Sequence, residues 1–574
     1  MLGQAFTMKT AAFFLCSVLA AVPAAYAQSA GSHTDLNRWC GKPYESGSPN
    51  YDPGGQTYPP SPSSSQLLYV QVVPRHSIYV DSETTGTFIV DATLSHTYGD
   101  AYYNSTYITG SNGTNPFTSL YFSIALESND KVLVQNNVLV NSTDNLFEFD
   151  LTQLEASMDA YNIVLYGASD DGNQTYTATT QLFYLPDKTT GSVTKIDNLY
   201  GGMLFKNNAT NYEFQPLLAF GFYTSYGGYL ELSLDNVQAY ADMGFNTIHP
   251  IPTFSPNLST IFDYADQINL LWQYDMRNTY QNLTSVAEQV SEVMDHSSLF
   301  AYYTADEPDG WEYPLNSTLL AYETITSLDK YHPVGLVLNC QNFYYGEYSS
   351  GADYVMEDAY PIGINATYSG PWGTPCNITY GDCGCDNCEG SVLDVSSRLD
   401  DLSNYQSWLG QWPKPLWAVP QSFSGEGYWA RDPTVAETYV MNQLAFNHKA
   451  KSIMIWDYPT ASELAAANAA QAKVVTVSPV LEFLVGAHPV PIVVDAYPLL
   501  DVAYWKVDTG VLVSVVNLDY VDTTASISIT LPFAGNGSTI VGQPWGDVQW
   551  SLTGTSLEAS GLAALATSFV ILEL

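Results

Sequence analysis

The sequence contains few basic side chains. Of its 574 residues, 17 are Lys or Arg and 58 are Asp or Glu, which gives a formal net charge of −41 at pH 7. Such a chain is repelled by the phosphates of nucleic acids and by anionic membrane surfaces. We therefore expect neither nucleic acid nor a membrane as a partner, and the charge suits a neutral polymer in an acidic medium.

Several motifs of nucleotide, serine and zinc chemistry are also missing. The sequence has no Gly-rich phosphate loop and no Gly-x-Ser-x-Gly turn, which are typical of nucleotide-binding proteins and of serine hydrolases. One Cys-x-x-Cys pair is present at Cys385 and Cys388, whereas a tetrahedral zinc site usually needs two such pairs. We expect no metal and no organic cofactor.

Long apolar runs are absent after the N-terminus. Lys9 is followed by an apolar stretch over residues 11–22 and by Ala25-Tyr26-Ala27, a pattern that predicts a secretory signal peptide over residues 1–27. The stretch is shorter than the ~20 residues that a membrane span needs. Glycosylation sequons agree with export, and we expect N-linked glycans on a secreted protein, at Asn104, Asn112, Asn141, Asn173, Asn208, Asn257, Asn282, Asn316, Asn365, Asn377 and Asn536.

Seven cysteines are present, and Cys16 lies in the predicted signal peptide. Six cysteines in an oxidising compartment predict three disulfides, with 15 possible pairings. The disulfide candidates are Cys40, Cys340, Cys376, Cys383, Cys385 and Cys388.

The pattern of apolar residues predicts a multidomain protein of the α/β plus all-β class. Residues 28–66 are a lead-in rich in Pro, Gly and Ser. Short alternating strands separated by turn residues predict an N-terminal β-sandwich over residues 67–200, and residues 488–574 predict a C-terminal β-sandwich. Between them, residues 210–487 alternate strand with amphipathic helix, which predicts a central (β/α)8 TIM barrel.

The barrel prediction rests on eight strands. We expect them at residues 217–223, 247–251, 269–274, 299–304, 334–338, 354–357, 416–420 and 453–456. Helices are predicted at residues 232–243, 284–294, 319–331, 395–409 and 435–446, and none is identified after the fifth strand. A long insertion, residues 365–389, follows the sixth strand and holds four of the cysteines.

Acidic side chains follow several of these strands. In a barrel of this kind the chemistry lies at the C-terminal ends of the strands. The fourth strand ends in Asp306-Glu307-Pro308, and the sixth is followed by Asp358. Glycoside hydrolysis needs one carboxylic acid to protonate the leaving oxygen and a second carboxylate to attack the sugar or to activate water. Two adjacent acids raise one pKa, as a general acid requires, so Glu307 is the predicted acid/base.

Here the chain resembles the glycoside hydrolases of clan A, in which a Glu after Asn and before Pro at strand four is the acid/base. It resembles more closely a secreted, fungal-type group of glycoside-hydrolase-like barrel proteins. The resemblance covers the barrel and is carried by Asp306-Glu307-Pro308, Asp358-Ala359-Tyr360-Pro361, Gln421, Pro433-Thr434-Val435-Ala436-Glu437 and Ile455-Trp456-Asp457-Tyr458. It implies a barrel enzyme that cleaves O-glycosidic bonds.

Two departures from clan A leave the second carboxylate open. Asp306 stands where the clan has Asn, and Gln421 follows strand seven, where the clan has its nucleophilic Glu. Asp358 is the first choice for nucleophile or base, and Glu357, Glu426 and Asp457 are alternatives. Because side chains alternate along a strand, Glu357 and Asp358 point to opposite faces, and only one can face the barrel mouth.

Further side chains at the strand ends are predicted to contact the sugar. These are Asp306, Gln421, Tyr360, Asn339, His249, Trp456, Asp457 and Tyr223. The preferred function is a secreted glycoside hydrolase that acts on a polysaccharide or glycan. The alternatives are a non-catalytic carbohydrate-binding or cell-wall protein that keeps the barrel, which Gln421 motivates, and a purely structural glycoprotein.

Overall fold

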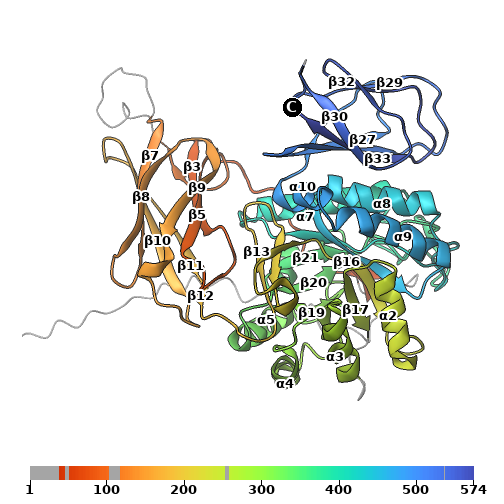
Figure 1. The fold of residues 1–574 in the computed structure, drawn as a ribbon, viewed down its shortest axis with the longest axis horizontal. Coiled ribbons are helices and arrows are strands. Elements are labelled where there is room, and N and C mark those ends of the chain that lie inside the picture. The colour runs from red at the N-terminus through yellow and green to blue at the C-terminus, as the bar shows by residue number, and fades with distance from the viewer. Residues whose placement is uncertain (1–37, 45–50, 53, 103–116, 252–257, 536) are drawn as a thin grey trace, which may run out of the picture.

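The computed structural model describes residues 38–44, 51–52, 54–102, 117–251, 258–535 and 537–574 (Figure 1). The predicted signal peptide and the sequons at Asn104, Asn112, Asn257 and Asn536 lie outside the described residues. The seven sequon asparagines inside them are all exposed, as glycosylation requires, and are Asn141, Asn173, Asn208, Asn282, Asn316, Asn365 and Asn377.

The N-terminal domain is a β-sandwich of two four-stranded sheets. One sheet has the order β6-β3-β5-β9 and the other β11-β10-β7-β8. Strict alternation of buried and half-buried residues along β3 turns one face inward, and Leu68, Phe88, Phe122 and Leu165 from both sheets meet in one core. The strands are β3 (Leu67–Pro74), β5 (Thr85–Ser95), β6 (Asp100–Ala101), β7 (Ser119–Leu126), β8 (Val132–Leu139), β9 (Ser142–Asp150), β10 (Tyr161–Ser169) and β11 (Thr175–Leu182).

Short elements lie within this sandwich and between it and the barrel. The pair β4 (Tyr79–Val80) and β12 (Tyr184–Leu185) is parallel, and η1 spans Leu151–Gln153. A three-stranded antiparallel sheet follows, made of β13 (Val193–Ile196), β14 (Met203–Lys206) and β15 (Gln215–Leu217). Met203 and Phe205 pack in one cluster with Phe300 and Tyr354 of the barrel interior. Because β15 directly precedes the first barrel strand, this sheet closes the N-terminal end of the barrel.

The central domain is a closed barrel of eight parallel strands. Its strands are β16 (Phe220–Ser225), β17 (Thr247–Ile251), β18 (Leu271–Asp275), β19 (Leu299–Asp306), β20 (Val334–Leu338), β21 (Tyr354–Glu357), β24 (Leu416–Ala418) and β25 (Ala450–Tyr458). Every residue of β18, β20 and β21 is buried, as expected for parallel strands covered on both faces.

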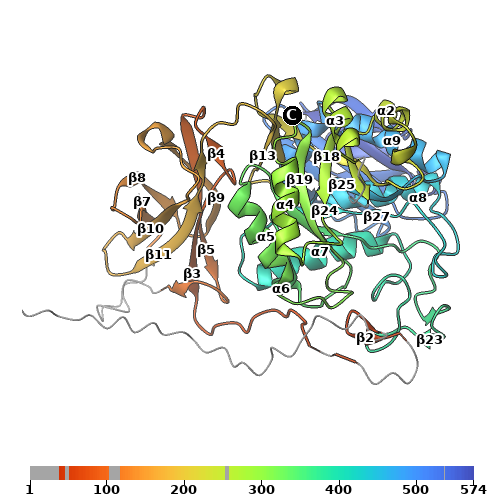
Figure 2. The same ribbon diagram turned by 90° about the horizontal axis from the view of Figure 1, so that it is seen from below.

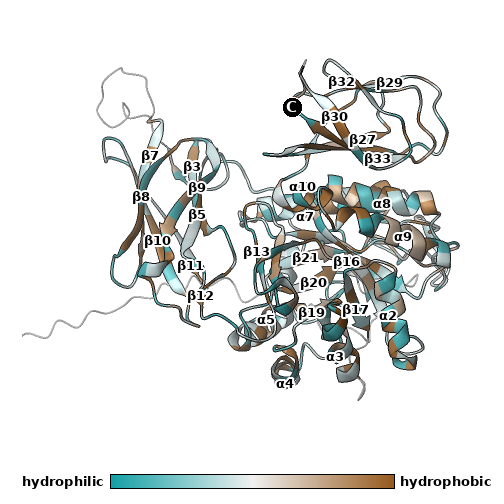
Figure 3. Ribbon diagram, viewed as in Figure 1, coloured by the Kyte–Doolittle hydropathy of each residue, from teal (hydrophilic) through white to brown (hydrophobic). Residues whose placement is uncertain are grey.

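Helices surround the barrel, and Figure 3 shows hydrophilic and hydrophobic residues mixed along α2 and α4. They are η2 (Asn208–Thr210), η3 (Leu230–Leu232), α2 (Leu234–Asp242), α3 (Leu258–Ile268), α4 (Leu283–Val293), α5 (Ser317–Leu328), α6 (Tyr345–Ser349), α7 (Leu393–Trp408), α8 (Val435–Asn447), α9 (Ser462–Val475) and α10 (Val480–Gly486). No single helix among the described residues is long and apolar enough to cross a membrane; α9 and α10 reach that length only together, and the pair is bent by 79°.

The C-terminal domain is a second β-sandwich. Its sheets have the orders β26-β27-β28-β33-β30 and β29-β32-β31. Trp505 and Phe569 of the larger sheet pack in the same cluster as Leu444 of α8, so this domain rests on the barrel helices (Figure 1). The strands are β26 (Val490–Pro491), β27 (Leu500–Val507), β28 (Gly510–Asn517), β29 (Ile527–Thr530), β30 (Thr539–Trp545), β31 (Ser551–Thr553), β32 (Ser556–Ala559) and β33 (Thr567–Glu573).

The predicted fold class, a TIM barrel flanked by two β-sandwich domains, is confirmed. The eight barrel strands lie where the alternation of strand and helix predicted them. Helices α3, α9 and α10 were not predicted, and the segment after the fifth strand holds only the five-residue α6. Residues 193–196 were assigned to the N-terminal sandwich, but as β13 they pair with β14.

The six predicted cysteines form three disulfides, Cys40–Cys340, Cys376–Cys383 and Cys385–Cys388. The first joins the N-terminal hairpin of β1 (Arg38–Trp39) and β2 (Lys42–Pro43) to the segment after β20. The other two lie in the insertion after β21, which also contains β22 (Tyr368–Ser369) and β23 (Thr374–Pro375).

Gly221 leaves no room for a side chain where β16 meets β17. A Cβ atom there would lie 2.0 Å from the carbonyl oxygen of Thr247. We expect Gly221→Ala to lower the free energy of unfolding by roughly 1–3 kcal/mol through overpacking. A urea titration would measure this, and Gly227→Ala, where no neighbouring atom lies within 4 Å of the added Cβ, is the control. Equal midpoints for the two variants would contradict the argument.

Candidate active site

A cavity of about 330 Å³ opens at the C-terminal ends of the barrel strands. Its polar lining residues are Asp306, Glu307, Asn339, Asp358, Asp382 and Glu426. Its aromatic lining residues are Trp39, Tyr44, Tyr223, Trp311, Tyr360, Trp372, Phe423, Tyr428, Trp429 and Trp456. All charged side chains among the described lining residues are acidic. Such a mixture of aromatic walls and a few placed polar groups is typical of ligand pockets.

Glu307 and Asp358 meet on the wall of this cavity. Glu307 follows β19 with φ +49°, and its N–H donates to the carbonyl of Val337 at 3.2 Å, which anchors the turn to the next strand. Asp358 directly follows β21. The two carboxyl groups are hydrogen-bonded to each other, and Asn339 Nδ2 donates to Asp358 Oδ1 at 3.1 Å.

This contact keeps a proton on the pair. Burial raises the pKa of Glu307 well above its ordinary value, and the neighbouring charge of Asp358 raises it further. Burial also raises the pKa of Asp358 well above its ordinary value, although the hydrogen bond with Glu307 lowers it in part. The pair therefore retains a proton, which the hydrogen bond holds between Glu307 and Asp358.

Asp306 also lines the cavity, but its charge is offset. Arg277 Nη1 donates to Asp306 Oδ2 at 2.7 Å, and the Tyr303 hydroxyl donates to Oδ1 at 2.6 Å. The same guanidinium donates from Nε to Asp275 Oδ2 at 2.6 Å. Asp306 is thus one end of an ion-pair chain that runs down into the barrel.

His249 was predicted to contact the sugar, but it does not line the cavity. Its side chain is fully buried beneath Tyr223, whose ring stacks on it at a centroid distance of 4.1 Å. The ring nitrogens lie 3.1 Å from Gln273 Oε1 and 2.7 Å from Asp275 Oδ2. His249 therefore belongs to the barrel interior and supports the chain of ion pairs that ends at Asp306.

Gln421, also a predicted sugar contact, likewise does not line the cavity. Its side-chain oxygen accepts from the N–H of Ile362 at 2.8 Å, and its amide nitrogen donates to the carbonyls of Ile362 and Phe423. The carboxamide is fully buried and has no free group for a ligand. Asp457 does not line the cavity either; burial, followed by the charge of Glu426, raises its pKa to about 6.

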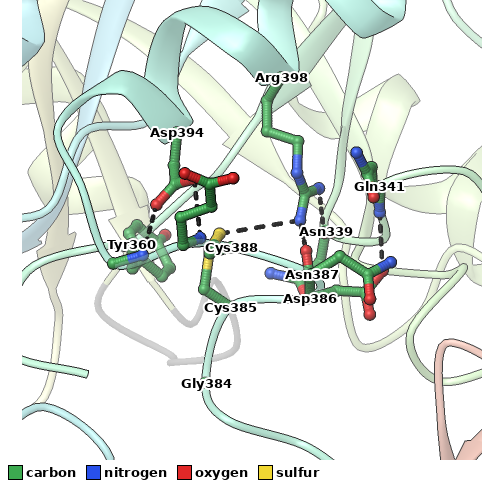
Figure 4. The surroundings of a disulfide bond; sticks show 12 residues. Asn339, Gln341, Tyr360, Gly384, Cys385, Asp386, Asn387, Cys388, Asp394 and Arg398 are labelled. Atoms are coloured by element: carbon green, nitrogen blue, oxygen red, sulfur yellow. Dashed lines mark hydrogen bonds between the residues drawn. A yellow bond between two sulfur atoms is a disulfide. The ribbon is translucent and has the colours of Figure 1, made fainter. Parts of the chain in front are cut away.

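Arg398 holds two residues of the barrel mouth from outside, and Figure 4 shows its contact with one of them, Asn339. Arg398 of α7 donates from Nη1 to the carbonyl of Asn339 at 2.9 Å and to Glu357 Oε1 at 3.1 Å. Glu357 thus points outward toward α7, as strand alternation predicted for one member of its pair with Asp358. Arg398 Nη2 lies 3.9 Å from the Cys388 sulfur, beside the Cys385–Cys388 disulfide that Figure 4 shows.

The aromatic side chains Tyr223, Tyr360 and Trp456 line the cavity as predicted contacts should. Sequence reasoning missed the aromatic residues outside the barrel strands. Trp39 and Tyr44 come from the N-terminal lead-in, and Trp372 comes from the insertion after β21. One signal was available: Cys40 can pair only with a barrel cysteine, and this would carry its neighbours to the barrel.

No group of three or more His, Cys, Asp or Glu side chains within the described ranges is placed to hold a metal ion.

No protein-family model matches the chain, and no curated protein matches it.

Similar solved structures are glycoside hydrolases, the class that the sequence motifs resemble. A debranching enzyme from Nostoc punctiforme is 9% identical, covers 59% of this chain and 88% of its own, and has a TM-score of 0.41. An α-amylase from Anoxybacillus is 10% identical and covers 60% and 90%, with a TM-score of 0.39. A β-glucuronidase from Parabacteroides merdae is 9% identical and covers 89% and 74%, with a TM-score of 0.32.

The Glu307–Asp358 pair predicts a particular pH dependence of stability. Because the pKa of Glu307 is higher in the folded than in the unfolded chain, the folded state retains a proton that the unfolded state loses. This contribution is complete below the unfolded pKa of about 4.3 and is lost as the pH rises through the folded pKa.

We therefore expect the melting temperature of Glu307→Gln to rise relative to wild type between about pH 4 and about pH 8. Differential scanning fluorimetry across this range would measure the difference. Glu323→Gln, at an exposed position of α5, is the control and should follow wild type throughout. A Glu307→Gln curve parallel to wild type would show that Glu307 is not held protonated.

Proposed function

We propose that the protein is a secreted glycoside hydrolase in which Glu307 is the general acid. The observation that carries this proposal is the hydrogen-bonded Glu307–Asp358 pair on the wall of an aromatic-lined cavity at the barrel mouth. Cleavage of an acetal needs a carboxylic acid that is still protonated at the working pH. Burial and the Asp358 carboxylate supply that condition for Glu307.

Asp358 supports this acid in a different way from the one expected from the sequence. Carboxyl groups are ~5–5.5 Å apart in retaining and ~6.5–9.5 Å apart in inverting glycosidases. Glu307 and Asp358 are instead hydrogen-bonded to each other. Because this hydrogen bond engages Asp358 directly, we assign it the role of keeping the proton on Glu307 until a glycosidic oxygen accepts it.

We assign the second carboxylate to Glu426. It lies in the loop after β24, three strands around the barrel from β19, and it lines the cavity. Its side chain is exposed and forms no hydrogen bond with the described residues, so it is available to a water molecule. In the proposed step, that water attacks the anomeric carbon and gives its proton to Glu426. The glycosidic bond breaks, and the leaving oxygen takes the proton of Glu307.

The roles of Glu307 and Glu426 can be distinguished by changing the leaving group of the substrate. A general acid matters most for a poor leaving group, so Glu307→Gln should lose about 10²–10⁴-fold in kcat on alkyl glycosides and little on 2,4-dinitrophenyl glycosides. Glu426→Gln should lose activity on both, because water activation is needed whatever the leaving group. Release of sugar from a panel of matched alkyl and dinitrophenyl glycosides, at acidic pH, would measure both effects.

Glu323→Gln on the surface of α5 is again the matched control and should keep wild-type rates. If Glu307→Gln retained wild-type activity on alkyl glycosides, the assignment of the general acid would fail. If wild type bound a glycan but cleaved none of the panel, the protein would be a carbohydrate-binding protein that keeps the barrel.

The charge of the cavity makes a separate prediction about the sugar. Five carboxyl side chains line it, those of Asp306, Glu307, Asp358, Asp382 and Glu426, and no described basic side chain does. An anionic sugar would be repelled, because like charges brought together out of water cost free energy. We expect kcat/KM for aryl uronides to fall at least about tenfold, ~1.4 kcal/mol, below that of the matching neutral glycosides. Comparable values for the two series would contradict a neutral substrate.

A further inference from the structure

Residues 38–44, which we call the strap, cross the barrel mouth beside the cavity. The strap contains the hairpin of β1 and β2 and contributes Trp39 and Tyr44 to the cavity wall. Trp39 Nε1 donates to Asn339 Oδ1 at 2.9 Å, so it holds the same side chain that donates to Asp358. The Trp39 ring also packs edge-on against Trp311, at a centroid distance of 5.1 Å.

Covalent and ionic contacts fasten the strap to the loops after β19 and β20. The disulfide Cys40–Cys340 joins it to the residue that follows Asn339. Arg38 forms an ion pair with Glu312, with Nε donating to Oε1 at 2.6 Å, and both side chains are less than one-tenth exposed. The N–H of Gly41 donates to the same carboxylate at 3.1 Å. The strap is therefore a fixed part of the mouth.

On its other side the strap meets the insertion that follows β21. The ring of Tyr44 stacks on Trp372, with centroids 4.6 Å apart and planes at 25°. The N–H of Gly381 donates to the carbonyl of Pro43 at 3.0 Å, and Lys42 forms an ion pair with Asp386. Figure 2 shows β2 of the strap beside β23 of the insertion.

The insertion in turn reaches the loop after β24. Trp372 Nε1 donates to the Tyr428 hydroxyl, which donates to Asp382 Oδ2 at 2.6 Å. Trp372, Asp382 and Tyr428 all line the cavity. The strap, the insertion and the loop after β24 therefore form one continuous rim around this part of the cavity.

From this rim we infer that the cavity takes the end of a glycan chain and that the protein removes sugars from chain ends. The inference rests on the proposed function and deepens it. An enzyme that cuts inside a polymer needs an open groove through which the chain continues on both sides of the acid. Here the rim blocks one side, and about 330 Å³ is at the small end of the usual range of ligand pockets, ~300–1,000 Å³.

The test uses neutral gluco-, manno- and galacto-oligosaccharides in three forms. One form has a 4,6-O-benzylidene group on the non-reducing end, one has a 2-aminobenzamide label on the reducing end, and one has both. Chain-end action cleaves at least one singly blocked form and cleaves the doubly blocked form about a hundredfold more slowly, because the blocked ends clash with the rim. Mass spectrometry of the products would measure the rates.

Equal cleavage of the doubly and singly blocked forms overturns the inference and leaves the proposed hydrolase standing. Cleavage of none of the forms overturns the proposed function and the inference with it.

A variant that opens the rim makes the test specific to the strap. Tyr44→Ala with Trp372→Ala removes the stacked pair, and we expect it to narrow the difference between doubly and singly blocked substrates about tenfold or more. Tyr58→Ala, in the exposed lead-in at 70% exposure, is the control and should leave the difference unchanged. Thermal unfolding of each variant confirms that it folds. If the double variant folds and keeps the wild-type ratio of cleavage rates for singly and doubly blocked substrates, the proposed role of the rim is overturned.

Discussion

The contact between the carboxyl groups of Glu307 and Asp358 is the interaction on which the candidate active site depends. Two acids in contact and out of water cannot both ionise easily, so one proton is retained. Within the described residues neither side chain forms an ion pair, whereas Asp306 is paired with Arg277 and Glu357 with Arg398. The barrel mouth therefore offsets the charges around the pair but leaves the pair itself to share a proton.

Asp309 is another buried acid near the pair, and its hydrogen-bond partners are backbone N–H groups rather than side chains. Its carboxylate accepts from the N–H groups of Gly310, Asn339 and Cys340, while burial raises its pKa to about 7. These bonds fix the start of the loop after β20, and Asn339 in that loop holds Asp358. Positions of the reacting groups thus derive from several strand ends, each of which contributes one short segment.

The sequence was sufficient for the barrel and for the acid pair, because both depend on local patterns. An apolar run that ends in Asp306-Glu307-Pro308 marks a strand end, and parallel strands bring all such ends together. The same reasoning failed for Gln421 and His249, which lie at the expected positions. Their polar groups are used by the Ile362 backbone and by Gln273 and Asp275, and competition between buried partners cannot be read from position along the chain.

The strap was only partly predictable, because any partner of Cys40 lies in the barrel but the sequence does not say which one it is. Cys40 and Cys340 are 300 residues apart, and nothing in the local pattern of the lead-in tells which of the 15 pairings forms. Irregular segments lack the regular backbone hydrogen bonds of a helix or sheet. At the barrel mouth they are held instead by disulfides, buried ion pairs and aromatic stacking. In barrel proteins the loops contact the substrate and the strands form the fold. Two barrels with similar strands can therefore differ in whether a glycan chain can extend past the site on both sides. Under the proposed function, substrate specificity is therefore to be sought in the strap and the insertion, and the acid chemistry at the strand ends.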